Sequence, residues 1–93
     1  ESEHIAAKPI PVETHVRSIH RRISERKHMM FSEVLADAPT LAVRVASFLA
    51  LLELYKRTMV DLGQDGPFAD ISIDFIEGSG ELVFGEEDEK EWS

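Results

Sequence analysis

Four histidines are the first residues to consider for chemistry, because neutral imidazole is a common ligand of transition metals. They occupy positions 4, 15, 20 and 28 of the 93-residue chain. Two ligands on one helix face need a spacing of three or four residues, whereas His15, His20 and His28 are five and eight residues apart. No acidic residue completes a ligand motif around them. The spacing therefore predicts solvated surface histidines and no metal site.

The sequence also lacks the common catalytic motifs. Gly78-Ser79-Gly80 has neither the following helix nor the lysine of a phosphate-binding loop. The chain contains no cysteine nucleophile and no G-x-S-x-G motif. Neighbouring acids such as Glu86-Glu87 lie in an acidic end, where no apolar pocket is expected to tune a catalytic acid. We expect no catalytic residues, no cofactor and no enzymatic activity.

The net charge of −8 is concentrated towards the carboxyl end. Residues 77–93 carry seven acidic residues against Lys90, whereas residues 1–76 carry eleven acidic and nine basic residues. This pattern predicts an acidic, flexible tail at 77–93. The sequence has no secretory segment and no apolar run long enough to span a bilayer. We therefore expect a soluble, cytoplasmic protein with no membrane contact.

A basic first helix is the basis of a DNA-binding hypothesis. Apolar residues at positions 12, 16, 19 and 23 predict a helix from Val12 to about Lys27. Its remaining surface includes Arg17, Arg21 and Arg22, which are candidates for contacts with phosphate. The longest helix, however, offers Ala, Leu and Val where a base-reading helix needs Arg, Lys, Asn or Gln. DNA binding through the first helix is therefore the alternative function.

The most apolar stretch is Phe48–Leu54, in a helix predicted from about Thr40 to Arg57. We assign one stripe of this helix to the core and expect a second strip, well round the helix, to face outward. The first stripe contains Leu41, Val45, Phe48, Leu52 and Tyr55, and the second contains Val43, Ala46, Ala50, Leu51 and Leu54. A helix that is apolar on most of its surface must be covered on most of its surface. The excess predicts an interface with another protein.

The other elements complete a fold class. His28–Phe31 is predicted to be a short strand, and Ser32 to cap a short helix over 33–36. Alternating apolar residues around Val60–Leu62 and Ile71–Phe75, separated by turn residues, predict a hairpin whose free edge can extend a partner's sheet. Leu82–Phe84 is either a short edge strand or part of the tail.

The order of these elements is that of a winged helix. The predicted α+β domain comprises three helices, one short strand and a two-stranded wing hairpin at residues 12–76. It follows an extended, proline-containing arm at 1–11 and precedes the acidic tail at 77–93.

Two segments of the sequence resemble a known family. They are Phe48-Leu49-Ala50-Leu51-Leu52-Glu53-Leu54 and, ten residues later, Gln64-Asp65-Gly66-Pro67-Phe68-Ala69-Asp70-Ile71. Together they resemble the C-terminal domain of bacterial segregation and condensation protein A (ScpA), the kleisin subunit of the SMC condensin complex. The resemblance runs from about Val12 to Phe75, and it implies that the chain is part of a longer protein.

The resemblance implies a winged helix that docks on the ATPase head of an SMC subunit and closes a ring around DNA, without hydrolysing ATP. By position it assigns partner contacts to Phe48 and Leu52, with weaker assignments to Leu51, Val60, Leu62, Gln64, Pro67, Phe68 and Ile71. Because Phe48 and Leu52 also lie on the stripe assigned to the core, either they line a groove open to the partner or the outward strip with Leu51 carries the contact. Other parts of the full-length protein recruit ScpB. The implied association with DNA and the nucleoid is indirect. The apolar surface favours weak self-association of the isolated fragment.

Overall fold

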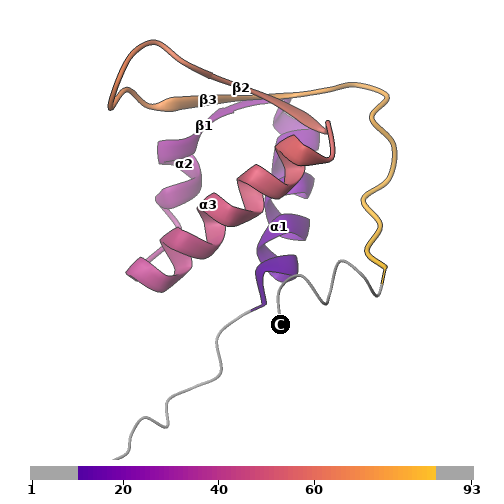
Figure 1. Cartoon of the computed structure of the whole chain (residues 1–93), viewed down its shortest axis with the longest axis horizontal. Helices are drawn as coiled ribbons and strands as arrows, with labels where there is room; N and C mark the ends of the chain where they lie inside the picture. The colour runs from indigo at the N-terminus through magenta and orange to yellow at the C-terminus, as the bar shows by residue number, and fades with distance from the viewer. Residues whose placement is uncertain (1–10, 86–93) are drawn as a thin grey trace, which may run out of the picture.

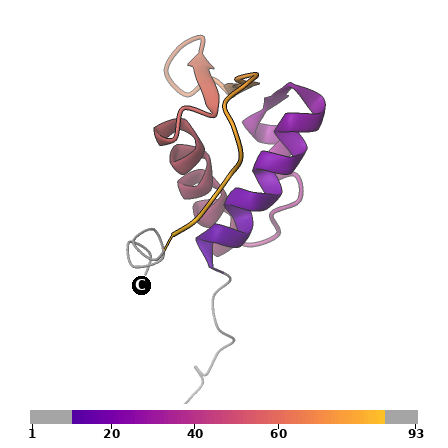
Figure 2. The ribbon, with the colours of Figure 1, turned by 90° about the vertical axis from the view of Figure 1, so that its right-hand side faces the viewer.

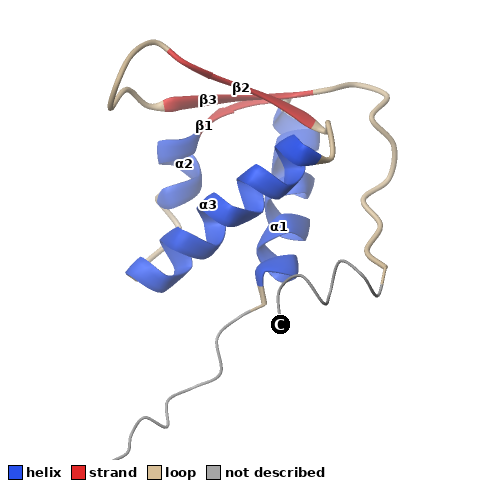
Figure 3. Ribbon diagram, in the orientation of Figure 1, coloured by secondary structure: helices blue, strands red, loops and turns tan. Residues whose placement is uncertain are grey.

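A computed structural model describes residues 11–85 of the chain, and these residues form three helices and a three-stranded sheet (Figures 1 and 3). In chain order the elements are α1 (Val12–Arg26), β1 (His28–Met30), α2 (Phe31–Leu35), α3 (Leu41–Lys56), β2 (Val60–Gln64) and β3 (Ile71–Phe75). The predicted α+β winged-helix arrangement is confirmed. The predicted arm, apart from Pro11, and the tail beyond residue 85 lie outside the described residues.

The helix α1 forms where the apolar spacing predicts it. Val16, Ile19 and Ile23 are buried on one face of this helix. Lys27 directly follows the helix, adopts a positive φ of 72° and donates its backbone N–H to the Ile23 carbonyl at 2.7 Å. This left-handed residue reverses the chain directly into β1.

The helix α2 begins at Phe31, two residues earlier than the predicted start, because Glu33 and not Ser32 supplies the cap. The Glu33 carboxylate accepts a hydrogen bond from the Met30 backbone N–H at 3.3 Å, which makes Met30 the N-cap residue. The strand β1 consequently ends at Met30. The prediction that Ser32 caps this helix is wrong.

The helix α3 runs as predicted, with Thr40 as its N-cap. The Thr40 hydroxyl accepts a hydrogen bond from the Val43 backbone N–H at 3.2 Å. The face packed against α1 and the sheet carries Ser47, Ala50, Leu51, Glu53 and Leu54, all of which are buried. This face contains much of the strip that the sequence assigns to the outside.

The predicted hairpin forms part of a three-stranded antiparallel sheet. The strand order is β1-β3-β2, so β3 lies in the middle and β2 is an outer strand. Met29 of β1 and Leu62 of β2 both lie opposite Ile73 of β3, which is fully buried. The sheet covers the ends of α1 and α3 (Figure 1), and its inner residues complete the core with those of the helices.

The segment that follows β3 runs between α1 and α3 in the view of Figure 2. It contains no strand up to residue 85, but Leu82 and Phe84 pack on the core. The guanidinium of Arg57 donates to the Val83 carbonyl at 2.7 Å. Arg17 and Arg57 each lie over the Phe84 ring, 4.8 and 4.5 Å from its centroid. Part of the predicted tail is therefore packed against the domain.

Candidate docking surface

The solvent-facing side of α3 carries large apolar residues along most of its length, beside the exposed Arg44 and Lys56. Its exposed large residues are Leu41, Val45, Phe48, Leu49, Leu52 and Tyr55. These include the stripe that the sequence assigns to the core, so that assignment is wrong. A helix that turns such a surface to solvent on a small domain marks an interaction site.

A groove runs between this face of α3 and the hairpin, with a volume of about 270 Å³. It is lined by Phe48, Leu52, Leu62, Gly63, Gln64 and Ile71. Phe48 and Leu52 are 41% and 40% exposed, so roughly half of each side chain is free to touch another molecule. The Phe48 ring packs edge-on against Phe31 of α2, at a centroid distance of 6.0 Å. Five of the nine residues predicted as partner contacts lie together in this groove.

Two other predicted contacts, Leu51 and Val60, are core residues. Leu51 is fully buried and Val60 is 1% exposed. Leu51 lies on the side of α3 that faces α1 and the sheet, one helix position away from the exposed Leu52. A partner bound to this conformation would not reach either side chain, so we correct both assignments.

The last two predicted contacts lie at the tip of the hairpin. Pro67 is exposed, and Phe68 has no shielding at all, with a relative exposure of 103%. Phe68 also has a positive φ of 66°, a strained conformation for an aromatic residue. The Gln64 side-chain amide steadies this turn by donating to the Ala69 carbonyl at 2.6 Å. Phe68 does not line the groove and forms a separate exposed contact point.

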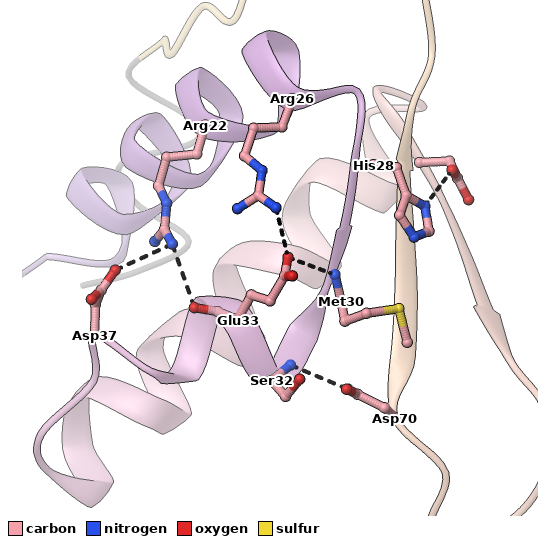
Figure 4. Close-up of polar contacts among 9 residues, drawn as sticks. Arg22, Arg26, His28, Met30, Ser32, Glu33, Asp37 and Asp70 are labelled. Atoms are coloured by element: carbon pink, nitrogen blue, oxygen red, sulfur yellow. Dashed lines mark hydrogen bonds and ion pairs between the residues drawn. The ribbon is translucent and has the colours of Figure 1, made fainter.

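Asp70 attaches the hairpin to α2, a role that the sequence analysis missed (Figure 4). Its carboxylate accepts hydrogen bonds from the backbone N–H groups of Ser32 at 3.1 Å and Ile71 at 2.8 Å. Hydrogen bonding from the Ser32 side chain, aided by these two N–H groups, holds the pKa of Asp70 below its ordinary value of 3.8. Its carboxylate lies beside the first turn of α2, where a negative charge is favourable. Asp70 thus fixes one wall of the groove against the helices.

The lowered pKa of Asp70 predicts a loss of stability in acid. Because the folded-state pKa lies below the unfolded value, the contribution is complete above pH 3.8 and disappears as the pH falls through the folded pKa. Asp70→Asn is expected to flatten the fall in unfolding free energy below about pH 4. The measurement is the urea midpoint between pH 2 and pH 6.

The matched control is Asp65→Asn, in the same loop, where the structure describes no hydrogen bond to α2. It should leave the acid slope as in the unsubstituted chain. If Asp70→Asn leaves the fall in unfolding free energy below pH 4 unchanged, Asp70 does not stabilise the attachment of the hairpin to α2.

The basic residues of the first helix are largely neutralised, and Figure 4 shows the ion pairs of Arg22 and Arg26. Four of them form ion pairs: Arg17 with Glu13 at 2.9 Å, Arg22 with Asp37 at 3.2 Å, Arg26 with Glu33 at 3.3 Å and Lys27 with Glu77 at 2.8 Å. Arg22 also donates to the Glu33 carbonyl. Within residues 11–85, Arg21 is the one cation of this helix with no ion pair. Nothing in this arrangement favours the alternative hypothesis of DNA binding.

The histidines differ from the predicted solvated set. His15 and His20 are half-buried, and within the described residues the Nε2 atom of each has no hydrogen-bond partner. Burial lowers the pKa of His20, whose ring packs edge-on against Phe75. His28 is exposed and pairs with Asp74 at 2.8 Å. Residues 11–85 contain no group of three or more acidic, histidine or cysteine side chains arranged to hold a metal.

No helix within residues 11–85 has the length and apolarity needed to cross a bilayer.

The fold and this surface together define a class of protein, a winged-helix domain whose longest helix turns an apolar face to solvent. The family model described as Segregation and condensation protein ScpA matches residues 1–76. The chain belongs to this ScpA family.

Two curated relatives are both described as Segregation and condensation protein A. Those of Listeria welshimeri and Listeria innocua are 32% and 31% identical to this chain over 78 residues. Each alignment covers 83% of this chain and 30% of the relative, so the chain spans about a third of their length. No solved structure matches the chain.

Proposed function

We propose that this chain is the head-docking module of a kleisin, which binds the ATPase head of an SMC protein in chromosome segregation and condensation. The observation that carries the proposal is the groove between α3 and the hairpin. Its apolar side chains Phe48 and Leu52 are half-exposed and lie within the part of the chain that the family model matches. The family's name supports the role in segregation and condensation.

The form of the surface suits a protein partner better than a nucleic acid. A partner that removes the exposed apolar residues of α3 from water lowers the free energy of the complex. Asp61, Asp65 and Asp70 on the hairpin would repel phosphate, and the cations of α1 are mostly paired with carboxylates. Phe68 at the hairpin tip provides a second aromatic contact, of the kind enriched in interface hot spots.

The module acts by binding and has no catalytic step of its own. Its contact with one SMC head contributes to closing the ring formed by the kleisin and the SMC subunits. Contact with ScpB belongs to other parts of the full-length protein, and association with DNA and the nucleoid follows indirectly from the complex.

The test is a calorimetric titration of this chain with the SMC head domain from the same organism. We expect a dissociation constant of about 10 μM or tighter, as for an interface of roughly 800 Å² on each partner. Circular dichroism of the same sample establishes that the domain is folded. Absence of binding at tens of micromolar by a folded domain would refute the proposed function.

A further inference from the structure

The outer strand β2 has an open edge beside the groove. Two hydrogen bonds show towards which neighbouring strand the backbone groups of β3 point. The Phe75 N–H donates to the Lys27 carbonyl on the β1 side at 2.8 Å, and the Ile76 N–H donates to the Met59 carbonyl on the β2 side at 3.0 Å. The backbone groups of successive residues in a strand point to opposite sides. Asp74 and Ser72 of β3 therefore face β2, where their partners are Asp61 and Gly63.

The residues between these partners direct their backbone groups the other way. Leu62 and Gln64 point their N–H and C=O groups away from β3, towards the edge with no neighbouring strand. Val60 has the same direction but is buried, so the accessible edge begins at Leu62. The strand contains no proline, and Asp61 is its one charged residue, so little in its sequence protects this edge from pairing.

The accessible edge and the groove form one continuous surface. Leu62, Gly63 and Gln64 belong to β2 and also line the groove. Side chains alternate between the two faces of a strand, so a strand laid along this edge would direct every second side chain towards Phe48 and Leu52. Glycine at position 63 allows β2 and β3 to lie close together here, because a Cβ at this position would lie 2.8 Å from the Ser72 hydroxyl.

An unfavourable charge pair indicates what the other side chains of such a strand should be. Asp61 lies directly opposite Asp74 on the solvent face of the sheet, and directly opposed like charges are destabilising. Asp74 pairs with His28 at 2.8 Å, whereas Asp61 has no ion pair within residues 11–85. A lysine or arginine on an added strand would supply the missing cation.

We propose that β2 accepts an extended strand of the partner head, in which apolar residues over the groove alternate with basic residues beside Asp61. This inference rests on the proposed function and specifies the form of its contact. Backbone hydrogen bonds at Leu62 and Gln64 fix the position of the added strand. The groove and Asp61 select its side chains.

The direct test is amide hydrogen exchange of this chain, alone and with the SMC head at saturating concentration. In the free chain, the amides of Asp61 and Gly63 should exchange slowly and those of Leu62 and Gln64 fast. Binding should slow exchange at Leu62 and Gln64 at least tenfold. A complex that forms while these two amides keep exchanging at their free rates overturns the strand addition and leaves docking intact. Failure of any complex to form refutes the proposed function itself, and with it this inference.

A pair of variants at one position isolates the backbone contribution. Gln64→Pro removes an N–H that points outward and leaves the pairing with β3, whereas Gln64→Ala removes the side chain and keeps the N–H. We expect the proline variant to bind the head about five- to tenfold more weakly than the alanine variant. Equal affinity of the two folded variants would contradict the inference.

The charge preference is tested by Asp61→Lys, with Asp65→Lys as the control of equal charge change in the neighbouring loop. Asp61→Lys should weaken binding by at least about fivefold relative to the control, and high salt should reduce the difference. Equal affinities of the two variants would exclude a basic residue beside Asp61.

Discussion

Replacing Leu52 with aspartate is expected to abolish binding to the SMC head while the domain remains folded. Leu52 is 40% exposed and lines the groove between α3 and the hairpin. In the free chain the new carboxylate stays in water, so its cost to stability is small. In a complex that fills the groove it would be removed from water, and burial of a carboxylate in an apolar contact costs several kcal/mol. A loss of at least about 100-fold in affinity follows, because each 1.4 kcal/mol is a factor of ten.

The matched control is Leu41→Asp. Leu41 lies on the same helix, is 77% exposed and does not line the groove. The two variants carry the same chemical change on α3, and both should unfold at close to the urea midpoint of the unsubstituted chain. Only Leu52→Asp should lose binding in the titration. If it binds as Leu41→Asp does, the groove is not the docking site.

Most of the fold could be predicted from the sequence because its local signals agree with one another. The spacing of Val16, Ile19 and Ile23 predicts α1, and the alternation of Ile71, Ile73 and Phe75 predicts β3. The N-cap of α2 could not be predicted, because Ser32 is a common N-cap residue type and Met30 is not. Only the geometry shows that the Glu33 carboxylate accepts from the Met30 N–H. The pairing of β1 with β3 involves residues 46 apart in the chain, such as His28 and Asp74, and local pattern carries no information on such pairs.

The direction in which α3 faces could not be predicted, because polarity does not mark its outer side. Charged residues of a helix normally point to solvent, as Arg44 and Lys56 of α3 do. Glu53, in contrast, is 5% exposed and is paired with Arg57 at 2.6 Å on the inner side. Ser47 is also buried, and its hydroxyl donates to the Val43 carbonyl. Two polar residues of α3, Ser47 and Glu53, are thus inside, whereas six large apolar residues are exposed beside Arg44 and Lys56. This partial inversion leaves apolar surface in water that a partner can cover, and it supports the proposed docking.

Two neighbouring leucines of α3 lie on opposite sides of this helix, one buried and one exposed. Leu51 is fully buried and packs in the core, so Leu51→Ala should lower the unfolding free energy by about 2–5 kcal/mol. That is a large fraction of the roughly 5–15 kcal/mol that holds a small domain together. Leu52→Ala leaves the core intact and should cost less than about 1 kcal/mol. The measurement is urea unfolding of both variants, followed by titration with the SMC head at low temperature.

The two substitutions should therefore have opposite consequences. Leu51→Ala reduces the folded population, but its folded molecules retain the groove and bind the head with nearly unchanged intrinsic affinity. Leu52→Ala remains folded and binds at least about tenfold more weakly, because a partner that fills the groove would bury this side chain and the truncation removes that apolar contact. The reverse result, a stable Leu51→Ala variant that fails to bind, would mean that α3 rotates when it meets its partner. In that case the face now buried against α1 would be the docking face.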